Sequence, residues 1–99
     1  MRTYVRLDHY VVDVLMRDLA GHDRRPAAFL VYLHLWVETR GVERRTMRTS
    51  HSRIATSTGL SRRTVQNALA LLVRRKLVRV IRDRPTAIPE YLVACPWRR

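Results

Sequence analysis

The sequence predicts a mainly α-helical fold with a small β-hairpin: a three-helix core, an extra N-terminal helix and two or three strands. Two patterns carry this prediction. Apolar residues recur at helical spacing along much of the chain, and near the C-terminus they alternate with arginines, as in a half-buried strand. The chain has 99 residues, of which 46% are hydrophobic, so it can bury one core. We expect one domain over residues 1–99, with an N-terminal extension (1–22), a core (26–94) and a tail (95–99).

The N-terminal extension predicts a short β-prone run followed by a helix. The run is Thr3–Leu7, and Asp8 after it is a natural N-cap. A helix is expected from His9 to about Leu19, because apolar residues lie on one face of it, and Gly21 is expected to end it.

The next predicted helix, Ala27–Thr39, is apolar almost all round. Pro26 fits its first position, since the N–H that proline lacks is not needed there. A helix of this kind is buried on more than one side, in the core or at a subunit contact. Tyr32 and Trp36 are therefore expected to be core or dimer residues rather than a platform for stacking bases.

Residues 51–73 predict two short helices joined by a sharp turn. Ile54 supplies the inward face of the first helix, which Ser50 or Ser52 can cap. Gly59 can take the left-handed conformation of a helix end, and Ser61 can cap the second helix. Apolar residues then return at helical spacing at Val65, Ala68, Leu69 and Leu72. This order is the helix-turn-helix arrangement.

The outward face of the second helix carries side chains that can read base edges. Arginine can bind guanine with two hydrogen bonds, and asparagine and glutamine can bind adenine in the same way. No acidic residue occurs between Thr46 and Arg82, whereas an ordinary surface helix mixes both signs. The outward positions, with Arg62 at their flank, are Arg63, Gln66, Asn67, Ala70 and Arg74.

The remaining segments predict a loop and a basic hairpin. Val42–Thr49 is expected to run from a loop into a short extended segment. Leu77–Arg82 alternates apolar and basic residues, and Glu90–Cys95 is a second β-prone run. Between them, residues 83–86 are turn-like, so the two runs should form a β-hairpin with arginine at its tip.

The charge is concentrated in the part of the chain that holds the two-helix motif. The formal net charge is +12, yet residues 1–43 carry six arginines and six acids. Residues 44–84 carry eleven arginines and one lysine against Asp83 alone. A basic surface of this kind favours a nucleic acid or an anionic membrane as partner. Membrane binding would need a bulky apolar helix face free to insert, and that face is required for the core.

Other classes of function have little support in the sequence. The single cysteine, Cys95, excludes an internal disulfide and fits the reducing cytoplasm. The four histidines show no metal-ligand spacing, so no metal site and no cofactor are expected. There is no glycine-rich phosphate loop and no Ser/His/Asp or Cys/His grouping, so we do not expect an enzyme. No signal peptide, membrane span or small-molecule ligand is expected either.

The segment SRIATSTGLSRRTVQNALALLVRRKLVRVIR resembles the winged helix-turn-helix family of bacterial and phage regulators. The resemblance covers roughly residues 26–94. Separately, the start of the chain, TYVRLDHYVVDVL, is loosely similar to the DNA-binding domains of phage and plasmid replication initiators. The shared positions are a small residue in the first helix, a turn glycine, Leu-Ser, Thr-Val and a closing Lys-Leu-Val: Ala55, Gly59, Leu60-Ser61, Thr64-Val65 and Lys76-Leu77-Val78.

The resemblance implies how duplex DNA would be bound. The second helix, Ser61–Arg74, would enter the major groove and the hairpin, residues 77–94, would reach the backbone or the minor groove. Base contacts are expected near the start of that helix, at Arg62, Arg63, Gln66 and Asn67. Phosphate contacts are expected at Ser52, Arg53, Ser61 and Thr64, and contacts with the backbone or minor groove at Arg82 and Arg84. Arg74, on the outward face of the helix, is also expected to bind DNA.

The leading interpretation is a sequence-specific, cytoplasmic DNA-binding protein that regulates transcription. The alternatives are the DNA-binding module of a replication initiator of a mobile element, or a winged-helix adaptor that binds proteins. An exposed apolar patch around Trp36 or Trp97 would favour the adaptor. A homodimer is open, with the helices at 9–19 and 27–39 as candidate contacts. RNA is disfavoured, because the basic part of the chain lacks an aromatic ladder.

Overall fold

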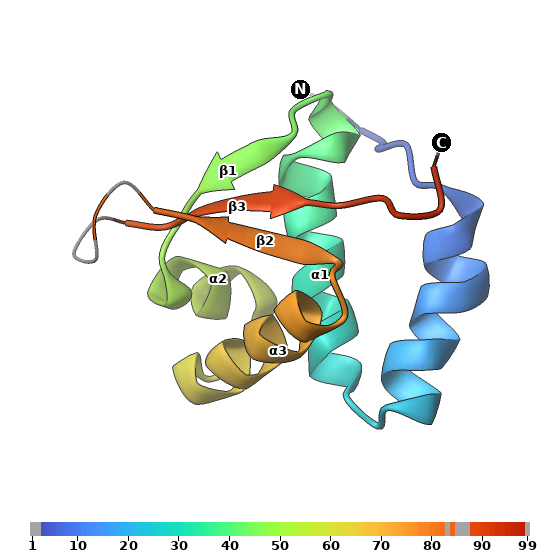
Figure 1. The fold of residues 1–99 in the computed structure, drawn as a ribbon, viewed down its shortest axis with the longest axis horizontal. Coiled ribbons are helices and arrows are strands. Elements are labelled where there is room, and N and C mark those ends of the chain that lie inside the picture. The colour runs from blue at the N-terminus through green and yellow to red at the C-terminus, as the bar shows by residue number, and fades with distance from the viewer. Residues whose placement is uncertain (1–2, 83, 85–87, 99) are drawn as a thin grey trace.

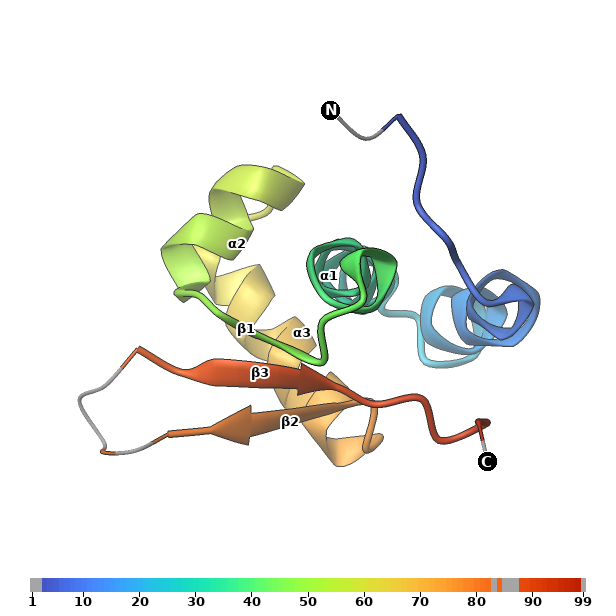
Figure 2. The same cartoon turned by 90° about the horizontal axis from the view of Figure 1, so that it is seen from above.

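Helix α1 (Pro26–Glu38) lies at the centre of the fold in the computed structural model, which describes residues 3–82, 84 and 88–98. Figure 2 shows α1 end-on, with the N-terminal helix on one side and α2 and α3 on the other. The expected burial on several sides is confirmed, and Tyr32 and Trp36 belong to the core. The buried residues of α1 are Ala28, Phe29, Val31, Tyr32, Leu35 and Trp36.

The N-terminal extension forms a helix that is wound mainly as a π-helix, in η1 (Val11–Leu15) and η2 (Arg17–His22). Val11, Leu15 and Leu19 are its buried residues. The expectation that Gly21 ends the helix is wrong. The helix continues to His22, and the left-handed residue that follows it is Arg24, with φ +54°.

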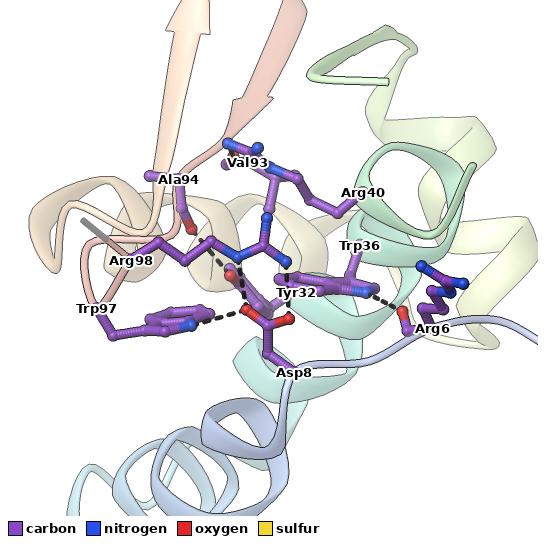
Figure 3. A network of polar contacts seen from close by, with 9 residues as sticks. All are labelled: Arg6, Asp8, Tyr32, Trp36, Arg40, Val93, Ala94, Trp97 and Arg98. Carbon is purple, nitrogen blue, oxygen red and sulfur yellow. Dashed lines mark hydrogen bonds and ion pairs between the residues drawn. The ribbon is translucent and has the colours of Figure 1, made fainter. Parts of the chain in front are cut away.

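The two ends of the chain meet over α1, and this contact changes the role expected for Asp8 (Figure 3). The Asp8 carboxylate accepts a hydrogen bond from Trp97 Nε1 at 2.9 Å and two from Arg98 at 2.7 Å. Only its backbone oxygen accepts from the first helical turn, at Val11 N. Residues 3–7 before it are extended but, within the described chain, form no strand. The expected side-chain cap and β-strand are therefore absent from the described N-terminal segment.

The two-helix motif has the expected geometry, with α2 at His51–Thr58 and α3 at Arg62–Arg74. Ser50 caps α2, since its Oγ accepts a hydrogen bond from Arg53 N at 3.2 Å. Gly59 is left-handed, with φ +77°, and it turns the chain between the helices. Ser61 caps α3 in the same way, accepting from Thr64 N at 3.1 Å. Both helix starts and the turn are thus set by local residues.

The strands form an antiparallel sheet beside the helices, with the order β1-β3-β2 (Figure 1). The strands are β1 (Thr46–Arg48), β2 (Val78–Ile81) and β3 (Glu90–Val93). The hairpin of β2 and β3 is as expected, and the short segment before α2 adds the third strand. Of the expected turn at 83–86, only Arg84 lies within the described residues. The fold is therefore a winged helix-turn-helix with an added N-terminal helix.

Candidate nucleic-acid interface

Helix α3 divides into a buried face and an exposed face. Val65, Ala68, Leu69 and Leu72 are buried against the rest of the core. The opposite side is solvent-exposed, so every side chain expected to read a base is available to a partner. The exposed residues on this side are Arg62, Arg63, Gln66, Asn67, Ala70 and Arg74.

The caps of α3 decide which hydroxyl groups can still reach a phosphate. Ser61 Oγ accepts from Thr64 N and donates to Thr64 Oγ1 at 2.8 Å. The hydroxyl proton of Ser61 is therefore used in the hydrogen bond to Thr64, whereas the Thr64 hydroxyl keeps a proton that can be donated outward. Of the two residues, Thr64 is the better placed to bind a phosphate oxygen.

A hollow of about 440 Å³ runs along the turn between α2 and α3. Ser52 of α2 and Arg62 of α3 both line it, together with Gly59 and Leu60 of the turn. Arg53, next to Ser52, is also exposed. Two of the expected phosphate-binding residues of α2 thus lie next to the start of the expected reading helix.

A larger cleft, of about 580 Å³, separates the outward side of α3 from the start of α1. Thr64, Asn67 and Arg74 line it from α3, and Arg24 and Arg25 line it from the turn before α1. Neither arginine was among the DNA-contacting residues expected from the sequence. The packing of α1 on α3 adds these two arginines to the interface, and the adjacent Arg-Arg pair was the only local signal for them.

Arg82, at the base of the wing, lies close enough to the helix-turn-helix for its charge to act on His51. Burial, followed by the charges of Arg82 and Arg62, lowers the pKa of His51 below its usual value of 6.5. His51 is the first residue of α2, Arg62 is the first of α3 and Arg82 follows β2. Arg82 and Arg84 are both exposed. Arg62 at the start of α3 and Arg82 after β2 therefore both act on His51, at the start of α2.

Arg74 is remote from this end, because it is the last residue of α3. At 1.5 Å per residue it lies about 18 Å along the helix from Arg62. Its neighbour Arg75 points elsewhere and forms ion pairs with Asp18 of the N-terminal extension and with Asp23, which follows it, at 3.7 and 3.3 Å. The exposed face thus runs from Arg62 to Arg74, and Arg75 joins the extension to the core.

Within the part of the chain that the structure describes, no three His, Cys, Asp or Glu residues are grouped so that they could hold a metal ion. No helix among the described residues is long and apolar enough to cross a membrane.

The family model for the Crp-like helix-turn-helix domain matches residues 24–91. The match covers more than half of the chain, so the protein belongs to this family of winged helix-turn-helix domains. Comparisons with curated proteins and with solved structures found no significant match. Membership of the family supports a DNA-binding, regulatory function, as the sequence pattern had indicated.

Proposed function

We propose that the protein binds double-stranded DNA in a sequence-specific manner and regulates transcription. The observation that carries this proposal is the exposed face of α3, which presents side chains able to read bases in a stretch of sequence, Thr46 to Arg82, that contains no acid. In this proposal α3 lies in the major groove, and its first turns, with Arg62, Arg63, Gln66 and Asn67, contact base edges.

The phosphate contacts in this proposal surround α3 on three sides. Ser52 and Arg53 approach the backbone from α2, and Thr64 and Arg74 approach it from α3 itself. Arg82 and Arg84 extend the contact along the wing, to the backbone or the adjacent minor groove. The cleft at the start of α1 adds Arg24 and Arg25. Such contacts fix the position on the duplex and make the affinity depend on salt.

The alternative function, an adaptor that binds proteins, would be favoured by an exposed apolar patch around Trp36 or Trp97. Trp36 is 1% exposed, and Trp97 is half-buried and stacks on Tyr10 and Trp36 with ring centroids 4.5 and 6.2 Å apart. Neither side chain forms an exposed apolar patch. These residues hold the N-terminal extension and the tail against α1.

Selection of binding sites from a random duplex library at fixed, near-physiological salt tests the proposal. An enriched inverted repeat, with half-site centres about one helical turn apart, is expected if a homodimer regulates transcription. Tandem direct repeats would instead favour a replication initiator. Binding without any enriched sequence would overturn the proposal that α3 reads bases.

A further inference from the structure

A second concentration of positive charge lies away from α3, in what we call the arginine cleft. It consists of two hollows of about 380 and 320 Å³ that share Arg40, Arg45 and Arg98. Only two acids, Asp8 and Glu43, line it. The six arginines come from segments that are distant in sequence, namely Arg6, Arg40, Arg44, Arg45, Arg79 and Arg98.

Most of the positive charge in the arginine cleft has no partner. Arg98 is paired with Asp8 at 2.7 Å, so this acid is already neutralised. Arg40 donates two hydrogen bonds to the backbone oxygen of Val93, at 3.1 and 2.9 Å, and keeps its charge. Among the described residues, none forms a hydrogen bond or ion pair with the side chains of Arg6, Arg44, Arg45 or Arg79. Like charges gathered in a cleft focus the field and attract a multivalent anion.

The inner part of the arginine cleft is held in place by the core. Trp36, at its base, is 1% exposed and donates from Nε1 to the backbone oxygen of Arg6 at 2.8 Å. The guanidinium carbon of Arg98 lies 5.6 Å from the centroid of the Trp36 ring. Figure 3 shows these side chains where the N-terminal segment, the end of α1 and the C-terminal tail converge. Part of the cleft is thus preorganised, which lowers the cost of ordering it on binding.

The position of the arginine cleft separates it from a duplex bound to α3. Its lining includes Trp36 and Arg40 at the C-terminal end of α1, whereas the lining of the cleft beside α3 includes Pro26 at the N-terminal end. The 13 residues of α1 place these ends about 20 Å apart. The larger hollow has a volume near the lower limit for small-ligand sites. Guanidinium groups bind phosphate with two parallel hydrogen bonds.

We propose that the arginine cleft binds a small molecule that carries two or more phosphate groups. Arg44 and Arg45, which precede β1 and are exposed, bind the phosphates from the rim. Arg40, which keeps its charge and is anchored on the Val93 backbone oxygen, binds them from the fixed inner part. None of the side chains proposed to contact duplex DNA lines this cleft, so neither proposal depends on the other.

Isothermal titration with inorganic triphosphate tests the site in the full chain. The Arg44→Ala/Arg45→Ala variant should bind triphosphate about tenfold more weakly or worse, because two charged contacts are lost. The matched control is Arg62→Ala/Arg63→Ala, an adjacent pair of exposed arginines on α3, which should bind it as the unchanged protein does. Equal melting temperatures of the proteins without ligand would show that the variants fold.

Further titrations define the ligand. Orthophosphate should bind much more weakly than triphosphate, since it offers a single phosphate group. ATP should bind at least as tightly as triphosphate. If ATP binds more tightly, the site also contacts the nucleoside. An equal loss of triphosphate binding in both variants, or in neither, would overturn the proposal. The proposal would also be overturned if the double substitution weakened binding of a random-sequence duplex more than binding of triphosphate, because the cleft would then be a DNA-binding site.

Discussion

Replacing Asn67 or Arg63 by alanine should change which DNA sequence the protein prefers while leaving its stability nearly unchanged. Both side chains are exposed, and among the described residues neither has a hydrogen-bond or ion-pair partner. Removing either one should therefore alter the free energy of unfolding by less than about 0.5 kcal/mol. Any larger effect on DNA binding then reports contacts with DNA rather than damage to the fold.

The expected size of the effect follows from the chemistry of base recognition. A good bidentate contact discriminates against the wrong base by about 1–3 kcal/mol, or roughly 5- to 150-fold in affinity. The preferred site of the unchanged protein should lose this much, whereas mismatched sites should lose little. Competition binding with the selected site and its single-base variants, at one salt concentration, measures the difference.

Arg84→Ala provides the contrasting case. Arg84 is exposed and belongs to the wing, where a phosphate contact would carry no sequence information. Its loss should weaken all duplexes alike and reduce the slope of affinity against salt by about one contact. If the Asn67 and Arg63 variants keep the full sequence preference of the unchanged protein, the proposed docking of α3 is wrong.

Three more perturbations have definite expected outcomes. Gly59→Ala should destabilise the fold by about 1 kcal/mol in urea unfolding, because φ is +77° there and no neighbouring atom lies within 4 Å of the added Cβ. The pKa of His51 is lowered in the free protein, and a bound phosphate would raise it, so binding would take up a proton. DNA affinity should therefore rise as the pH falls from about 7.5 to about 5.5, and His51→Ala should abolish much of that rise. The Arg98 hydrogen bonds lower the pKa of Asp8 below its usual 3.8, so the stabilisation is present above that pH and is lost as the pH falls through the lowered value. Asp8→Asn should therefore cost about 1 kcal/mol at neutral pH, discounted for partial exposure, and less once acid protonates the carboxyl group, as thermal unfolding across an acid pH series would show.

The helix-turn-helix could be predicted from the sequence because its determinants are local. A serine cap acts on a backbone N–H three residues away, and a glycine sets its own backbone conformation. Ser50, Gly59 and Ser61 therefore have the same roles in the structure as in the sequence. The apolar spacing of α3 likewise determined which of its faces would be exposed, and hence which side chains could contact DNA.

Local signals were weaker where the chain ends meet. Asp8 is followed by a helix, and its sequence context favours a cap. In the structure its carboxylate binds Trp97 and Arg98 instead, about ninety residues away along the chain. A partly buried carboxylate is stabilised more by a guanidinium than by a backbone N–H, because a hydrogen bond between two charged groups is the stronger one. Asp8 and Arg98 are both visible in the sequence, but no rule based on nearby residues predicts that they pair.

The sequence by itself determined the family, the two-helix motif and the basic character of the surface, because these follow from residue type and short-range spacing. Only the tertiary structure decided how that charge is divided. Packing of α1 against α3 brings Arg24 and Arg25 to the surface proposed for DNA. Convergence of four segments at the other end of α1 gathers a separate group that includes Arg6, Arg79 and Arg98. A net charge gives only a total, whereas binding depends on where in space the charges meet.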